Sequence, residues 1–135
     1  MLKKIYHLGV AVRSIEETIP FYRDILGLAL TGIEEVAEYG VKVAFLQIGE
    51  SKIELLEPIG DGMIARFLEE HGPGLHHVAY EVDDLVAAIR HCESMGVKMI
   101  DRAPRRGAHG ALVAFVDPGS SHAVVTELCQ LRPSH

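Results

Sequence analysis

Apolar and polar residues alternate along the segment 3–12, which reads KKIYHLGVAV, and this period of two predicts a β-strand. Ser14 and Glu17 then form an S-x-x-E capping box, which is typical of a helix start. Gly27 stands where a left-handed C-terminal cap is expected. Pro20 predicts a kink or a late helix start, because an interior proline costs roughly 3 kcal/mol. The apolar stripe of the predicted helix consists of Ile15, Ile19, Tyr22 and Leu26.

The same succession returns in the second half of the chain. The segment 76–82 alternates as a strand, and Asp84 is the candidate N-cap of the helix that follows. Gly96 ends that helix. The apolar stripe of this second helix consists of Leu85, Ile89, Cys92 and Met95.

Segments rich in strand-forming residues follow each predicted helix. They span 29–33, 41–48 and 52–57 in the first half, and 97–101, 111–116 and 123–129 in the second. The fold class is therefore α+β, with two tandem βαβββ modules that form a curved mixed sheet around a cleft. We expect one domain over 1–135, with modules at about 3–58 and about 74–131. The connector at about 59–73 includes a helical candidate at 62–70.

An internal repeat relates the two halves residue by residue. The segment VAFLQIG at 43–49 returns as VAFVDPG at 113–119, an offset of 113 − 43 = 70. The same offset pairs the two strand histidines, since 77 − 7 = 70, and a three-residue insertion then raises the offset to 127 − 54 = 73. The polar residues that the repeat relates are His7 with His77 and Glu54 with Glu127.

Strand parity separates the neighbouring histidines His76 and His77, because successive side chains point to opposite faces. His76 shares a face with bulky residues, which must pack on a helix. His77 shares the other face with Ala79 and Glu81, as His7 does with Gly9 and Ala11. The small-residue face is the one on which a curved sheet leaves room for a ligand.

Glu54 and Glu127 lie inside apolar runs, where a desolvated carboxylate without a partner costs several kcal/mol. A single strand histidine is more often structural, and a single strand glutamate usually faces solvent. Two histidines and two glutamates that an internal repeat relates favour one metal site that all four residues share. The set suits a borderline divalent ion such as Co²⁺, Mn²⁺, Ni²⁺, Zn²⁺ or Fe²⁺. Four protein ligands on a six-coordinate ion leave two positions for water or substrate.

Charge and composition exclude several classes of function. The chain has 13 basic and 19 acidic residues, a net charge of −6, and no basic run with interleaved aromatic residues, so nucleic acid is not an expected partner. No apolar run approaches the roughly 18 to 20 residues of a membrane-spanning helix. We expect no targeting segment before the first predicted strand. Cys92 and Cys129 form no CxxC pair, which indicates reduced thiols in a cytoplasmic protein.

Paired βαβββ modules with His, Glu, His and Glu on their strands resemble the vicinal oxygen chelate superfamily, which includes glyoxalase I and the extradiol dioxygenases. Within it the chain is most similar to the methylmalonyl-CoA epimerases. The segments KIELLEP at 52–58 and GLHHVAYEVDD at 74–84 are specific to epimerases. The likeness covers nearly the whole chain and includes PRRGAHGALVAFVDP at 104–118.

This resemblance implies a vicinal oxygen chelate fold and one divalent metal ion, with Co²⁺ preferred and Mn²⁺, Ni²⁺ or Zn²⁺ as alternatives. It implies a homodimer that interconverts (R)- and (S)-methylmalonyl-CoA, a step of propionate metabolism. The proton α to the thioester is removed and returned on the other face through a metal-stabilised enolate. The metal ligands that the resemblance implies are His7, Glu54, His77 and Glu127, which repeat and parity also select.

The resemblance makes Glu127 one of the two acid/base groups, and Glu54 is the candidate for the other. Gln47 and His109 are candidate substrate-binding residues. A glyoxalase I-type lactoylglutathione lyase, or another metal-dependent isomerase, would use the same four ligands and stays an alternative. A metal-free small-molecule binding protein of the same fold is a further alternative.

Overall fold

The fold is described from a computed structural model, for residues 1–122 and 124–132. The first residue of the predicted strand 123–129 and residues 133–135 lie outside the described residues. The chain divides into two compact units, one of residues His7–His76 and one of Met1–Tyr6 with His77–His135. The boundaries between the units fall within strands β1 and β5, and the assignment of one domain to the whole chain stays a prediction.

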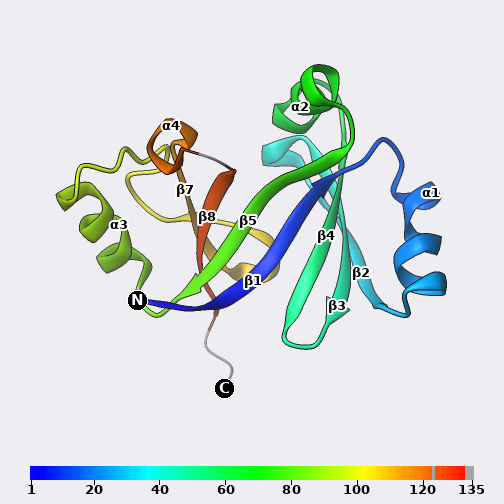
Figure 1. Ribbon diagram of the computed structural model, residues 1–135, viewed down its shortest axis with the longest axis horizontal. Coiled ribbons are helices and arrows are strands. Elements are labelled where there is room, and N and C mark those ends of the chain that lie inside the picture. The colour runs from blue at the N-terminus through cyan, green and yellow to red at the C-terminus, as the bar shows by residue number, and fades with distance from the viewer. Residues whose placement is uncertain (123, 133–135) are drawn as a thin grey trace. The chain divides into compact units, whose positions relative to one another are not determined.

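The unit His7–His76 contains four strands in the order β2-β3-β4-β1. β1 runs parallel to β4, whereas β2, β3 and β4 are antiparallel neighbours. The two α-helices of this unit follow β1 and β4, as Figure 1 shows. The elements are β1 (Leu2–Ala11), α1 (Ile15–Ile19), η1 (Pro20–Ile25), β2 (Ala29–Val36), η2 (Ala37–Tyr39), β3 (Val41–Ile48), β4 (Ser51–Pro58) and α2 (Met63–His71).

The second unit repeats this arrangement with strands in the order β5-β8-β7-β6. β5 runs parallel to β8, and β8, β7 and β6 are antiparallel neighbours. The elements are β5 (Gly74–Val82), α3 (Leu85–Ser94), β6 (Arg105–Arg106), η3 (Ala108–Gly110), β7 (Leu112–Val116), α4 (Pro118–Ser121) and β8 (Val125–Gln130). The predicted fold class, two tandem βαβββ modules, is confirmed, and the helix predicted at 62–70 is present as α2.

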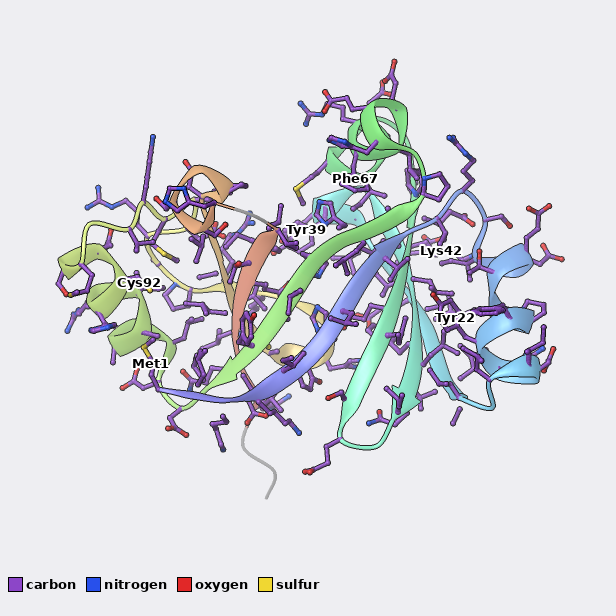
Figure 2. All side chains as sticks on the ribbon, viewed as in Figure 1. Met1, Tyr22, Tyr39, Lys42, Phe67 and Cys92 are labelled. Carbon is purple, nitrogen blue, oxygen red and sulfur yellow. The ribbon has the colours of Figure 1, made fainter. Side chains whose placement is uncertain are left out.

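Each four-stranded sheet packs one face against the helix that follows its first strand. In the first unit Ile15 and Ile19 of α1 pack against β3 and β4, and Tyr22 lies beside this core (Figure 2). In the second unit Leu85 and Ile89 of α3 pack against β7 and β8. No helix of the described ranges 1–122 and 124–132 has the length and apolar composition to cross a bilayer.

The first helix changes type at Pro20. The hydroxyl Oγ of Ser14 accepts a hydrogen bond from the Glu17 backbone N–H at 3.1 Å, as the capping box predicts. α1 ends at Ile19, and Pro20–Ile25 continues as a π-helix because proline has no N–H for the α-helical hydrogen bond. The wider turn shifts the phase of the apolar stripe. The prediction that Leu26 is a core residue is therefore wrong, since Leu26 is 54% exposed.

The second helix follows its prediction until its last turn. The carboxylate of Asp84 accepts a hydrogen bond from the Ala87 backbone N–H at 3.1 Å, and Gly96 has the expected positive φ of 83°. α3 ends at Ser94, one residue before the last position of the predicted stripe. Met95 is 70% exposed, so its assignment to the core is wrong.

The segment 97–101, predicted as a strand, forms only an isolated bridge between Met99 and Val116. The carboxylate of Asp101 accepts a hydrogen bond from the Phe115 backbone N–H at 2.9 Å and pairs with the Arg105 guanidinium at 2.8 Å. The Asp101 side chain thus accepts the hydrogen bond of the Phe115 N–H on β7, which the backbone carbonyl of a neighbouring strand would otherwise accept. The second strand of the second module is instead the two-residue β6.

A side chain from the last strand of each module binds the start of that module's helix. The carboxylate Oε1 of Glu57 accepts a hydrogen bond from the Ile15 N–H at 2.8 Å, and Oε1 of Gln130 accepts one from the Leu85 N–H at 2.8 Å. Glu57 and Gln130 are repeat mates, since 130 − 57 = 73. The repeat therefore conserves the connection between strand and helix as well as the histidines and glutamates.

Replacing Glu57 with alanine should lower the free energy of unfolding by about 1–2 kcal/mol, because it leaves the half-buried Ile15 N–H without its acceptor. Glu57→Gln keeps an oxygen at the same position and should stay within about 0.5 kcal/mol of the unsubstituted protein. Urea denaturation followed by circular dichroism measures both. Equal losses for the two variants would contradict the role of Oε1 as the acceptor.

Candidate metal-binding residues

The first His–Glu pair lies in the unit His7–His76. His7 is on β1 and Glu54 on β4, and the register places the Gly9 Cα opposite that of Glu54. His7 Nδ1 lies 3.1 Å from Glu54 Oε2. Both residues are buried, with exposures of 4% and 8%. The parallel pairing of β1 with β4 thus brings together two residues that are 54 − 7 = 47 positions apart.

The second pair repeats this arrangement in the other unit. His77 is on β5 and Glu127 on β8, and the register places the Ala79 Cα opposite that of Glu127. His77 Nε2 lies 3.4 Å from Glu127 Oε1, and the two residues are 5% and 6% exposed. The ring of Phe115, whose Cα pairs with that of Glu127, meets the His77 ring edge to face at 6.0 Å.

The donor sets of both pairs fit a divalent metal ion. A buried carboxylate requires a nearby cation, and a neutral imidazole beside it adds a second ligand without adding charge. Two ligands about 2.1 Å from one ion at right angles are about 3.0 Å apart, close to the His–Glu distances of 3.1 and 3.4 Å. Each unit therefore supplies one candidate metal-ligating pair, and imidazole with carboxylate suits a borderline ion.

His76, the neighbour of His77, has different surroundings. Its ring meets that of Phe67 on α2 edge to face at 5.0 Å (Figure 2 labels Phe67). Burial lowers the pKa of His76 from 6.5 to about 4, so its imidazole is neutral at pH 7. His76 thus packs on a helix, as strand parity predicts. The structural role belongs to His76, and the candidate ligand is His77.

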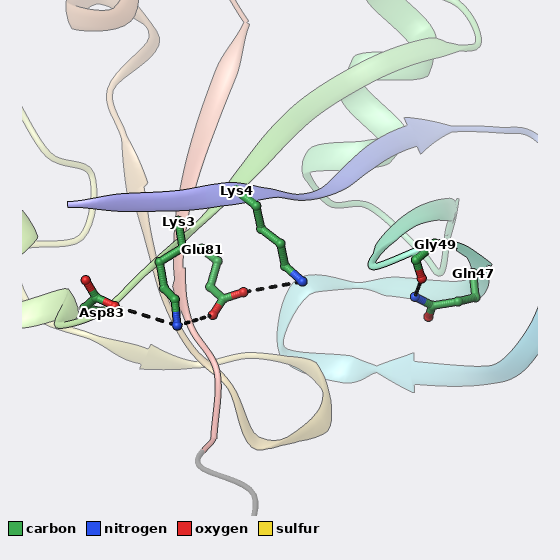
Figure 3. Close-up of polar contacts among 6 residues, drawn as sticks. All are labelled: Lys3, Lys4, Gln47, Gly49, Glu81 and Asp83. Carbon is green, nitrogen blue, oxygen red and sulfur yellow. Dashed lines mark hydrogen bonds and ion pairs between the residues drawn. The ribbon is translucent and has the colours of Figure 1, made fainter.

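A third buried carboxylate, Glu81, shows how the fold compensates such a charge without a metal. Glu81 is 9% exposed and lies on the β5 face of His77. Its carboxylate lies 3.4 Å from the Lys3 ammonium and 3.8 Å from that of Lys4 (Figure 3). Asp83 lies 3.7 Å from Lys3. Glu81 is therefore a partner of the N-terminal lysines.

The two predicted substrate-binding residues lie at turns: Gln47 is near the end of β3, and His109 is between β6 and β7. The side-chain nitrogen of Gln47 donates to the Gly49 carbonyl at 2.7 Å, at the turn between β3 and β4 (Figure 3). Gln47 shares a face with Phe45, whose Cα pairs with that of Glu54. His109 is exposed and has a φ of 57° in the turn between β6 and β7. Contact of Gln47 or His109 with a substrate stays a prediction.

The sequence analysis did not select Lys52, a cationic residue on the strand face of the His7–Glu54 pair. The Cα of Lys52 pairs with that of His7, and Lys52 shares its strand face with Glu54. Its half-buried side chain places Nζ 5.6 Å from the centre of the Phe45 ring. The repeat mate of Lys52 is Val125, since 125 − 52 = 73. In the strand segment SKIEL, Lys52 stands two residues before Glu54, so the two side chains share a face. This spacing could have identified Lys52 from the sequence.

The sequence also matches a known family. Residues 6–115 match the model of the Glyoxalase/Bleomycin resistance protein/Dioxygenase superfamily. The chain belongs to this superfamily. Its two βαβββ modules and the paired histidines and glutamates agree with the membership that the vicinal oxygen chelate resemblance implied.

Two curated relatives of this superfamily protein are similar to it in sequence over nearly the whole chain. The uncharacterized protein YqjC of Bacillus subtilis is 41% identical over 96% of this chain and 93% of YqjC. The mitochondrial methylmalonyl-CoA epimerase of Mus musculus is 37% identical over 96% of this chain and 74% of the mouse protein.

Two solved structures are similar over almost the whole chain. The hypothetical protein BH1468 of Bacillus halodurans is 44% identical and superimposes with a TM-score of 0.95 over 98% of this chain and 96% of that one. A methylmalonyl-CoA epimerase in complex with methylmalonyl-CoA and NH4⁺ is 34% identical, with a TM-score of 0.92 over 96% of this chain and 95% of the other. The chain is thus related to methylmalonyl-CoA epimerases, and its fold is that of the superfamily.

Proposed function

We propose that this superfamily protein is a metal-dependent methylmalonyl-CoA epimerase that interconverts the (R) and (S) forms. The observation that carries the proposal is the buried His–Glu pair that recurs in both units, at 3.1 Å and 3.4 Å. The similarity to proteins named methylmalonyl-CoA epimerase over 96% of the chain supports the choice of substrate. A homodimer in the cytoplasm is part of the same proposal.

We further propose that His7, Glu54, His77 and Glu127 together bind one divalent ion, with Co²⁺ preferred. The support comes from the internal repeat, from the burial of all four residues and from the donor chemistry of each pair. A bound divalent ion acts as a Lewis acid that makes the α-proton of the substrate more acidic. The alternative metals are Mn²⁺, Ni²⁺ and Zn²⁺.

The two carboxylates are the proposed acid/base groups. Inversion at a carbon atom needs a proton acceptor on one side of the planar intermediate and a proton donor on the other. Glu127 and Glu54 come from different strands and are repeat mates, so they are suited to serve opposite faces. Glu127, in its ionised form, takes the α-proton of one epimer, and Glu54, in its protonated form, gives its own proton to the other face. For the reverse reaction the roles exchange.

Lys52 is the proposed binding partner of the free carboxylate of the substrate. The ammonium lies on the strand face of Glu54 and is held over the Phe45 ring. Lys52→Gln should lower kcat/KM about 10- to 100-fold, because a hydrogen bond to a charged group contributes about 1.5–3 kcal/mol. Lys42→Gln, on the opposite face of β3 from Phe45, is the matched control and should leave kcat/KM unchanged. An equal effect of both variants would contradict the assignment.

The proposed function is tested by α-proton exchange in deuterated water with (S)-methylmalonyl-CoA, with added Co²⁺ and with a chelator. We expect deuterium incorporation together with formation of the (R) epimer, and loss of both after chelation that added Co²⁺ restores. NMR measures the incorporation, and a stereospecific coupled assay measures the epimer. The absence of exchange with every metal tested would overturn the proposal. Turnover of a glutathione hemithioacetal instead would favour the lactoylglutathione lyase alternative.

A further inference from the structure

Asp101 is a buried carboxylate outside the four residues proposed to bind metal. It is 9% exposed and lies in the same unit as the second His–Glu pair. Its Oδ1 pairs with the Arg105 Nε at 2.8 Å, and its Oδ2 accepts a hydrogen bond from the Phe115 N–H at 2.9 Å. A buried polar group whose partners are all in place makes its surroundings rigid. Asp101 therefore fixes the groups that it binds.

The backbone of Phe115 is bound at both of its polar groups. Its N–H donates to the Asp101 carboxylate. Its carbonyl accepts hydrogen bonds from the N–H of Ile100 at 2.9 Å and from the N–H of Asp101 at 3.3 Å. A buried N–H without an acceptor is costly, so β7 would have to shift at Phe115 if the carboxylate were removed. The position of Phe115 thus depends on the Asp101 side chain.

The side chain of Phe115 lies on the sheet face of the second His–Glu pair. Its Cα pairs with that of Glu127, and the Cα of Glu127 pairs with that of Ala79, two residues after His77. Phe115, Glu127 and His77 therefore share one face of the sheet. The buried Phe115 ring meets the His77 ring at 6.0 Å with an angle of 83° between the planes. Such edge-to-face contacts favour one orientation of the two rings.

The first module has a different arrangement at the corresponding positions. Thr31 is the repeat mate of Asp101 and Phe45 that of Phe115, since 101 − 31 = 70 and 115 − 45 = 70. Thr31 belongs to the strand β2, in which the Cα of Gly32 pairs with that of Phe45. The Thr31 hydroxyl donates to the Phe45 carbonyl at 3.3 Å. A strand supports Phe45, whereas one carboxylate binds the Phe115 N–H, and a single substitution can therefore remove that support.

We propose that Asp101 is a positioning residue for the second His–Glu pair: it holds the Phe115 backbone, and the Phe115 ring fixes the orientation of the His77 imidazole. The inference rests on the proposed function for the role of His77 as a metal ligand. The groups behind a metal-ligating histidine set the direction of its nitrogen, and a rotated ring binds the ion more weakly. In this assignment Asp101 acts only through Phe115, and Arg105 keeps the carboxylate in place.

NMR of the metal-free protein tests the orientation of His77 directly, because the ring current of Phe115 shifts the signals of the His77 ring protons. His77→Gln assigns these signals. Asp101→Ala and Phe115→Leu should both move them, whereas Asp101→Asn keeps an oxygen for the Phe115 N–H and should leave them close to their original positions. The matched control is Gln130→Ala, which removes the side-chain acceptor of the Leu85 N–H in the same unit and should leave the signals unchanged.

Isothermal titration with Co²⁺ measures the consequence for metal binding. Asp101→Ala and Phe115→Leu should each weaken Co²⁺ binding about tenfold, and Asp101→Asn should recover most of the affinity. If Asp101 acts through the ring, the double variant should bind Co²⁺ as weakly as Phe115→Leu alone. Independent effects would instead multiply to about a hundredfold loss. Gln130→Ala should bind Co²⁺ normally, and urea denaturation of the metal-free variants shows that each is folded.

Three results would overturn the assignment. These are His77 signals that Asp101→Ala leaves unchanged, equal losses of Co²⁺ affinity in Asp101→Ala and Gln130→Ala, and independent losses in the double variant. If Asp101→Ala does not fold, Arg105→Gln takes its place, because it removes the partner of Oδ1 and should move the same signals. Unchanged signals in Arg105→Gln would then overturn the assignment.

The outcome for Asp101 is separable from that for the proposed function. Asp101-dependent His77 signals in a protein without α-proton exchange would support the positioning of His77 and reject the epimerase. Exchange together with Asp101-independent His77 signals would do the reverse.

Discussion

Replacing Glu127 with glutamine is expected to abolish epimerisation in both directions, with a loss of kcat of about 10³-fold or more. Glutamine keeps the shape of the side chain but cannot accept the α-proton. In deuterated water Glu127→Gln should lose exchange from the epimer that Glu127 deprotonates, whereas Glu54→Gln should lose exchange from the other epimer. NMR of each purified epimer with each variant measures these four rates.

Glu57→Gln is the control for both substitutions. Glu57 lies on β4 three residues after Glu54 and binds the start of α1, so its isosteric replacement should leave kcat unchanged. Full epimerase activity of Glu127→Gln would remove Glu127 from the mechanism. If Glu127→Gln and Glu54→Gln lost exchange from the same epimer, one base would act alone, and the assignment of opposite faces would be wrong.

The neighbouring histidines should differ sharply in metal binding. His77→Gln is expected to lower metal affinity by at least about 10²-fold and to abolish epimerisation, because it removes an imidazole ligand. His76→Gln should keep one Co²⁺ per chain, since His76 packs on Phe67 of α2. Elemental analysis after dialysis and titration with Co²⁺ measure both variants, and circular dichroism verifies that both are folded.

The repeat mate of His77 gives an independent check. His7→Gln should lose metal as His77→Gln does, if the two His–Glu pairs bind one ion. Retention of one full equivalent of Co²⁺ by His77→Gln would contradict the assignment of His77 as a metal ligand. If His76→Gln and His77→Gln were both folded and lost the same amount of bound Co²⁺, the loss would come from a disturbance of the strand and not from removal of the His77 imidazole.

The helix around Pro20 shows which features of a helix the sequence predicts and which it does not. The proline, the capping serine and the closing Gly27 were all visible in the sequence, and the capping bond between Ser14 and Glu17 is present. The change to a π-helix was not visible, because it depends on how the chain restores its hydrogen bonds after a residue without an N–H. That choice decides the exposure of Leu26.

The strand predicted at 97–101 failed for a different reason. Its apolar composition favours a strand, but pairing depends on which groups reach the amides of β7. Asp101 reaches the Phe115 N–H with its side chain, and Arg105 then balances the charge of Asp101. Local composition contains no information about this long-range competition. Parity with Glu54 could have selected Lys52 from the sequence, but its place beside His7 follows only from the strand register.

The sequence by itself determined the repeated βαβββ order, because hydrophobic periodicity and capping residues are local properties. It also determined which histidine of the doublet lies on the small-residue face of its own strand, as His7 does on the first strand, because strand parity and the repeat depend only on spacing. The tertiary structure decided that each histidine approaches its glutamate, at 3.1 Å and 3.4 Å. Such contacts follow from the pairing of strands that are distant in the chain, and spacing along the sequence does not specify them.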